Sequence, residues 1–106
     1  MSVKQDFALD KARKLITLLK STGMDIHEAY LFGSAATDRG DENSDIDLAI
    51  VSKEFTGFPF FDVKKISKYR RAIDLRLEVH PFALDDILDN PPLFFLDIKS
   101  KGIQIS

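Results

Sequence analysis

The stretch Tyr30–Val51, YLFGSAATDRGDENSDIDLAIV, decides the fold of this chain. Its apolar start, Tyr30 to Phe32, predicts the end of a strand, and the run Asp45 to Val51 predicts a second strand. Between them, Gly33 and Ser34 predict a turn into a short helix. A strand, a tight turn, a short helix and a second strand can hold polar groups close together at one edge of a sheet.

The two aspartates of the second strand form a candidate metal site. Side chains alternate across a strand, so Asp45 and Asp47 lie on one face while Ile46 and Leu48 enter the core. Carboxylates about 7 Å apart along a strand repel each other unless a cation lies between them. Oxygen ligands of this kind suit Mg²⁺ or Mn²⁺. The polar stretch Thr37–Ser44 predicts a loop that leads to this site and covers it.

The rest of the chain predicts helices interleaved with strands. The predicted elements are a helix over Ser2–Ser21, a strand over Ile26–Phe32, a helix over Phe60–Arg71, a strand over Ile73–His80 closed by Pro81, a helical turn over Leu84–Leu88, a helix over Leu93–Lys101 and a short strand over Ile103–Ile105. This order predicts an α+β fold, in which a small mixed β-sheet has helices packed mainly on one face. A chain of 106 residues is expected to form a single domain over residues 1–106.

The spacing of the polar residues resembles a known family. Gly33 and Ser34, followed after ten residues by Asp45-Ile46-Asp47, resemble the GSx10DxD signature of the minimal nucleotidyltransferases in the DNA polymerase beta superfamily. The resemblance implies an Mg²⁺-dependent enzyme with two ions, or with Mn²⁺ in their place, that transfers AMP from ATP to an acceptor hydroxyl. It implies that Asp45 and Asp47 bridge the ions, while Gly33 and Ser34 bind the nucleotide phosphates.

The family also uses a third acidic residue from a later strand. Asp74 and Glu78 both lie on the polar face of the predicted strand, about 13 Å apart, so only one of them can serve. Glu78 is the favoured candidate because the ending EVHPF resembles the third-acid strand of the family. Asp74 is the alternative. The two histidines, His27 and His80, lack metal-ligand spacing and are expected to have structural roles.

Composition limits the partners and the compartment. The formal net charge of −2 does not indicate a nucleic-acid binder, although Lys64–Arg71 holds a basic cluster that leaves such binding open. The chain has no cysteine, no apolar run long enough for a membrane span and no secretory signal, so the cytoplasm is the expected location. The resemblance implies a separate protein partner of the HEPN type, with this chain as the antitoxin of a toxin–antitoxin pair; a homo-oligomer is the alternative. Phe58, Phe60 and Phe61 could supply an apolar patch for association.

Two rival functions remain open at this point. One is a non-catalytic protein of the same fold that binds a nucleotide or a partner. The other is processing of nucleic acid through the basic cluster. A calcium loop of the EF-hand type is excluded, because Ile46 occupies the position that needs glycine and Ser52 the position that needs glutamate.

Overall fold

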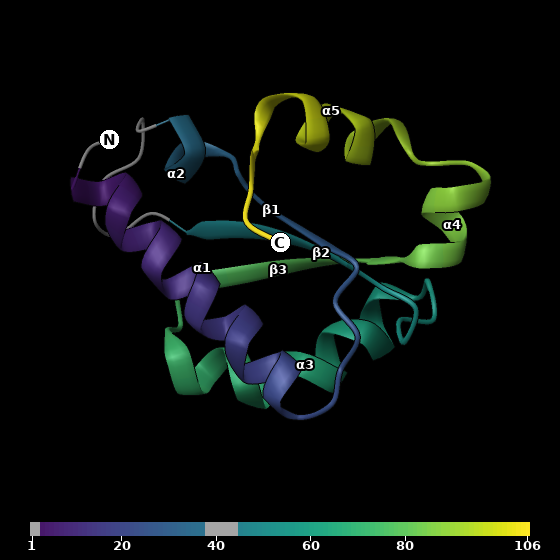
Figure 1. Cartoon of the computed structure of the whole chain (residues 1–106), viewed down its shortest axis with the longest axis horizontal. Coiled ribbons are helices and arrows are strands. Elements are labelled where there is room, and N and C mark those ends of the chain that lie inside the picture. The colour runs from purple at the N-terminus through teal and green to yellow at the C-terminus, as the bar shows by residue number, and fades with distance from the viewer. Residues whose placement is uncertain (1–2, 38–44) are drawn as a thin grey trace.

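The computed structural model describes residues 3–37 and 45–106. Within this part of the chain, helices are interleaved with strands in the order that the sequence predicts (Figure 1). They are α1 (Val3–Ser21), β1 (Glu28–Phe32), α2 (Ser34–Thr37), β2 (Ile46–Ser52), α3 (Pro59–Ile73), β3 (Leu77–Ala83), α4 (Leu84–Asp89), α5 (Leu93–Lys101) and β4 (Ile103–Gln104). The predicted polar loop lies, apart from Thr37 at the end of α2, outside the described residues.

The strands form one mixed sheet in the order β3-β2-β1-β4. Strand β1 is antiparallel to both β2 and β4, whereas β2 and β3 are parallel. Parallel neighbours need a long crossover, and α3 provides it between β2 and β3. The mixed sheet and the α+β class are therefore as predicted.

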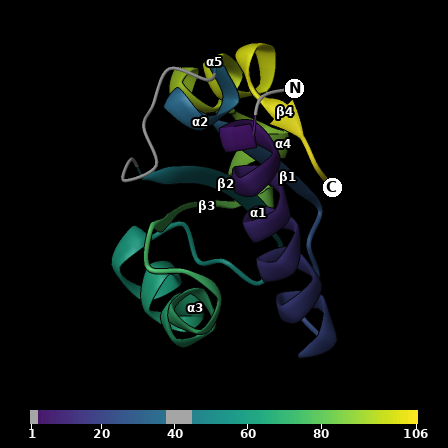
Figure 2. The same cartoon turned by 90° about the vertical axis from the view of Figure 1, so that its left-hand side faces the viewer.

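The two long helices α1 and α3 pack together against one face of the sheet (Figure 2). Alternate strand residues point into this layer, so Leu48 and Ile50 of β2 meet Leu15 of α1 and Ile66 of α3 in the larger core. Each of these four side chains is at most 1% exposed. Burial of this apolar surface is the main stabilising contribution of the layer.

The opposite face of the sheet carries a smaller core under α5. Tyr30, Ala49 and Val51 point to this side and pack with Phe95 and Ile98 of α5. The Tyr30 and Phe95 rings meet edge to face at 6.0 Å. Burial and a hydrogen bond from the Tyr30 hydroxyl to Glu28 raise the pKa of Tyr30 to about 12. Asp47, near the start of β2, points to the same face and stays partly exposed.

The third strand differs from the prediction at both ends. Helix α3 runs to Ile73, so Asp74 to Arg76 form a turn and β3 begins at Leu77. The strand then continues through Pro81 to Ala83, although Pro81 was expected to close it. Proline is tolerated because β3 is an edge strand, where a missing backbone N–H costs no ladder hydrogen bond on the open side.

Nowhere in residues 3–37 or 45–106 does a helix have both the length and the apolar character needed to cross a lipid bilayer.

Candidate active site

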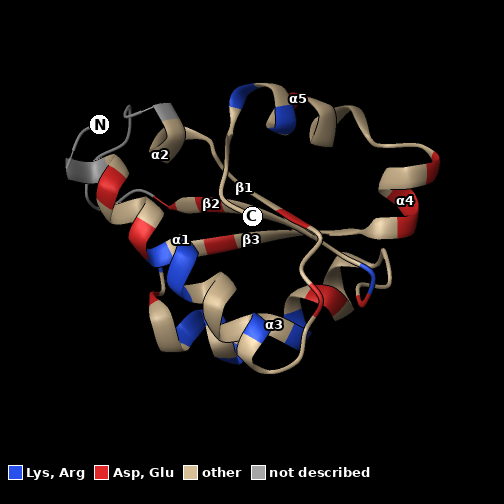
Figure 3. Cartoon of the chain, viewed as in Figure 1, with Lys and Arg blue, Asp and Glu red and all other residues tan. Residues whose placement is uncertain are grey.

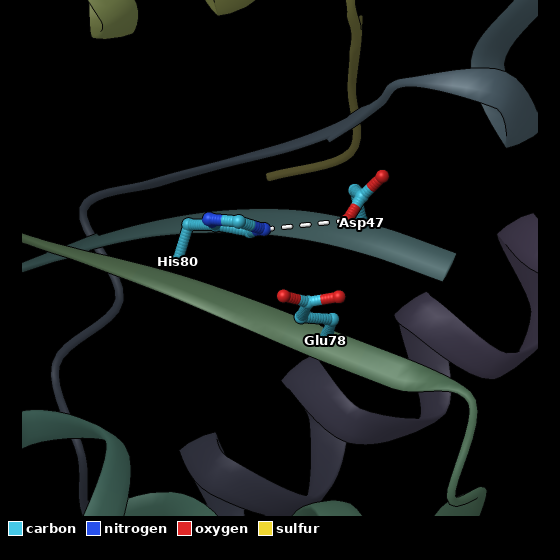
Figure 4. A group of neighbouring side chains, drawn as sticks. All are labelled: Asp47, Glu78 and His80. Atoms are coloured by element: carbon cyan, nitrogen blue, oxygen red, sulfur yellow. Dashed lines mark hydrogen bonds and ion pairs between the residues drawn. The ribbon is translucent and has the colours of Figure 1, made fainter. Parts of the chain in front are cut away.

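Two carboxylates from neighbouring strands meet on the open face of the sheet. Asp47 of β2 pairs in register with Glu78 of β3, and the parallel arrangement turns both side chains to the same face. Figure 4 shows the two carboxylates and the His80 ring gathered over β2 and β3. One potential ligand atom from each of these three residues lies within 4.8 Å of the others. Of the three acids that the sequence predicts as ligands, the structure thus places Asp47 and Glu78 side by side.

Gly33 brings the turn after β1 close to the same carboxylate. Phe32, the last residue of β1, pairs with Asp47, and Gly33 follows with a positive φ of +73°. A Cβ atom at Gly33 would overlap the Asp47 carboxylate. Glycine is therefore required here both by the backbone conformation and by the space that Asp47 occupies. The half-buried Ser34 begins α2 directly after this turn.

Asp45 has a different environment from Asp47. It immediately precedes β2, is exposed and does not belong to the group formed by Asp47, Glu78 and His80. Asp45 is one of the residues that line a pocket of about 380 Å³ beside the edge strand, together with Glu78, Arg70 and Arg76. Asp45 and Glu78 both line this pocket, whereas Asp47 does not, so the structure brings Asp47 and Glu78 together but leaves Asp45 outside their group.

Asp74, the alternative third acid, is held in an ion pair away from β3. Its carboxylate accepts hydrogen bonds from the backbone and the guanidinium of Arg76, with Nη2 to Oδ2 at 2.8 Å. These hydrogen bonds lower the pKa of Asp74 to about 2. The Arg76 guanidinium also lies 4.5 Å from the centre of the Phe7 ring. Asp74 thus ties the end of α3 to the turn before β3, a structural role.

The sequence as a whole matches one family model. Residues 13–106 match the family described as Polymerase beta, Nucleotidyltransferase. The chain belongs to this nucleotidyltransferase family. No curated protein shows significant sequence similarity to it.

Solved structures show where else this nucleotidyltransferase fold occurs. A crystal structure of a Sulfolobus solfataricus protein assigned to the nucleotidyltransferases matches with a TM-score of 0.67 and 20% identity, over 95% of this chain and 81% of the other. A crystal structure of a toxin–antitoxin with AMP-PNP matches with a TM-score of 0.61 and 22% identity, over 88% of this chain and 70% of the other. At these identities the similarity establishes the fold.

His80 belongs to the same group of side chains as Asp47 and Glu78, although the sequence predicts a structural role for it. Its Nε2 lies 3.3 Å from Oδ1 of Asp47, and it shares a strand face with Glu78 two residues earlier. The Glu-x-His spacing on a strand was the available signal. It was not decisive, because the third member of the group comes from β2.

The basic cluster belongs to α3, which packs on the face of the sheet that carries the larger core (Figure 3). Ile66 anchors α3 in the larger core, whereas Asp47 and Glu78 point to the opposite face. Arg70 donates to the carbonyl oxygens of Leu75 and Leu77 at 3.0 and 3.1 Å. At least this one member of the cluster fastens α3 to the sheet.

Proposed function

We propose that this chain is a divalent-metal-dependent enzyme that transfers AMP from ATP to an acceptor hydroxyl. The proposal depends on one observation, the placement of Glu78 beside Asp47 next to the glycine turn at Gly33. Two carboxylates this close repel each other, and a bound cation relieves that repulsion. Their oxygens are the ligands that Mg²⁺ and Mn²⁺ prefer, so the donor set fits the metal that the family resemblance implies.

Three carboxylates of this chain would hold the cations. Asp47 and Glu78 would supply the closely spaced oxygens, and Asp45, two residues before Asp47, would supply further ones. When bound, two cations offset the negative charge that develops on the transferring phosphoryl group and on the leaving pyrophosphate.

The order of the strands suggests which side each of the two substrates would occupy. Gly33 follows β1 and Glu78 lies on β3, so they flank Asp47 of β2 from opposite directions. We place the triphosphate on the β1 side, where Gly33 leaves room and the Ser34 hydroxyl can donate a hydrogen bond to a phosphate oxygen. The acceptor hydroxyl then approaches from the β3 side, next to Glu78.

A second protein is proposed to bring the acceptor. Phe58, Phe60 and Phe61, at the start of α3, are 65%, 74% and 60% exposed and offer apolar surface for association. The partner would be a HEPN-type protein for which this chain is the antitoxin, or a second copy of the chain. The fold similarity to a toxin–antitoxin structure that contains AMP-PNP supports a toxin–antitoxin arrangement, and the HEPN type of the partner follows from the family resemblance alone.

Labelled transfer tests the proposal. The chain is incubated with Mg²⁺, ATP labelled on its α-phosphate and the protein encoded by the neighbouring gene. We expect label to be transferred to the acceptor, and we expect no transfer when EDTA is present from the start. Asp47→Asn should lower the transfer rate by about 100-fold or more, since a shared metal ligand is lost. Asp85→Asn, a change of the same kind on the exposed surface of α4, should leave the rate unchanged. Metal-dependent ATP binding without any transfer would instead favour the non-catalytic alternative.

A further inference from the structure

His80 lies where it can contribute a nitrogen ligand. Its Nε2 is 3.3 Å from the Asp47 carboxylate, and the Glu78 carboxylate completes a group in which one ligand atom from each residue lies within 4.8 Å of the others. Figure 4 shows the imidazole ring extending along the sheet toward Asp47, with Glu78 beside it. The three side chains converge from two strands on one small volume.

Aromatic neighbours fix the direction of this ring. The Phe32 ring lies 4.9 Å from the imidazole centre and the Phe94 ring 5.9 Å from it, both close to edge to face. These contacts hold the His80 ring with Nε2 toward the carboxylates. An imidazole held this way is presented as a ligand with little rotational freedom to lose.

We propose that His80 binds the cation held by Asp47 and Glu78, and that it shifts the preference of this site from Mg²⁺ toward Mn²⁺ and other transition metals. Mg²⁺ favours oxygen ligands, whereas imidazole favours first-row transition metals. The inference rests on the proposed function for the role of the metal in transfer. Metal binding itself can be measured without ATP or an acceptor.

Pulsed EPR of the protein with Mn²⁺ alone tests direct coordination. The wild-type chain should show a ¹⁴N hyperfine coupling to Mn²⁺, and incorporation of ¹⁵N-histidine should convert it to a ¹⁵N coupling. The chain has only two histidines and no cysteine, so the assignment needs a single comparison. His80→Gln should abolish the coupling, and His27→Gln, which changes an exposed histidine outside the site, should retain it.

Metal affinities supply the second measurement. His80→Gln should weaken Mn²⁺ binding by about tenfold or more and Mg²⁺ binding by about twofold or less. His27→Gln should change neither affinity. The ¹⁵N-histidine experiment uses the unaltered sequence, so it remains decisive even where His80→Gln fails to fold.

Two results would overturn the inference. One is Mn²⁺ that binds without nitrogen coupling, which would show that His80 only hydrogen-bonds to Asp47. The other is a wild-type chain that binds no Mn²⁺ at millimolar concentration. A chain that shows the histidine coupling but transfers no AMP would refute the proposed function and leave the inference intact.

Discussion

Gly33 combines two constraints that a matched substitution can separate. Gly33→Ala introduces a side chain at positive φ and also displaces the Asp47 carboxylate, whereas Gly23→Ala, at φ +91°, meets nothing within 4 Å. Both variants should lose about 1 kcal/mol of stability. Only Gly33→Ala should also weaken Mn²⁺ binding and lower kcat/KM for transfer by about tenfold or more. Urea unfolding and metal titration check the two effects, and equal metal affinity in both variants would contradict this account.

The Asp74–Arg76 pair predicts a pH dependence of stability. Hydrogen bonds from Arg76 lower the pKa of Asp74 from its usual 3.8 to about 2 in the folded protein. A lowered folded pKa stabilises above the unfolded pKa, and this contribution is lost as the pH falls from about 5 toward 2. Asp74→Asn should therefore lower the free energy of unfolding by about 1 kcal/mol at pH 7, an amount that allows for solvent screening of the ion pair, and by less at pH 3. Urea unfolding of the wild-type protein and of Asp74→Asn at the two pH values measures that difference.

The Asp74→Asn variant also distinguishes the two candidates for the third acid. Transfer should survive Asp74→Asn and be lost in Glu78→Gln. The reverse pattern would identify Asp74 as the third carboxylate.

At the scale of elements, a buried carboxylate holds the loop that starts α3. Asp62 is 2% exposed and accepts hydrogen bonds from the Thr56 N–H, the Thr56 hydroxyl and the Gly57 N–H at 2.8 to 3.0 Å. Asp62→Ala leaves these donors without their acceptor and should cost about 2 to 4 kcal/mol. Thermal unfolding checks the loss. Asp62→Asn keeps one acceptor oxygen and should lose less; equal losses would show that packing alone matters here.

Local signals predicted most elements, and the failures have physical causes. Leu93 to Gly102 formed the expected helix and its end, because the flanking prolines and the glycine act locally. The run Ile73 to Arg76 alternates between apolar and polar residues as a strand does. In the structure, however, Ile73 is the last residue of α3, and the N–H of Asp74 still donates a hydrogen bond to the Arg70 carbonyl oxygen. The sequence predicts a strand end at Pro81, because proline is tolerated only at an edge and the order of the strands is not visible in a local pattern.

At the scale of the whole molecule, Phe95 joins the C-terminal layer to the sheet. It is 1% exposed and packs on Tyr30 and on Phe82, whose ring centre is 5.2 Å away. Phe95→Ala should lower the free energy of unfolding by about 3 kcal/mol or more. Phe95→Ala should accelerate hydrogen exchange more in α5 and β4 than in α1. Phe94→Ala, at a half-exposed position, should cost clearly less; equal costs would contradict the assigned role of Phe95.

The candidate site was predictable only in part, because half of it depends on tertiary pairing. Gly33, Ser34, Asp45 and Asp47 are close in sequence, and their spacing indicated a shared function. The neighbours Glu78 and His80 reach Asp47 through the parallel register of β2 and β3, which no local pattern encodes. From the sequence, Glu78 is therefore favoured only through the family resemblance, with Asp74 as the alternative, and His80 is expected to have a structural role.

The proline inside β3 has a consequence for how copies of this protein meet. An unpaired strand edge can template the addition of another strand and so lead to aggregates. Here one border of the sheet is interrupted by Pro81, and the other ends in β4, only two residues long. Continuous sheets that extend from one molecule to the next are thereby disfavoured, so self-assembly, where it occurs, should proceed through helical surfaces.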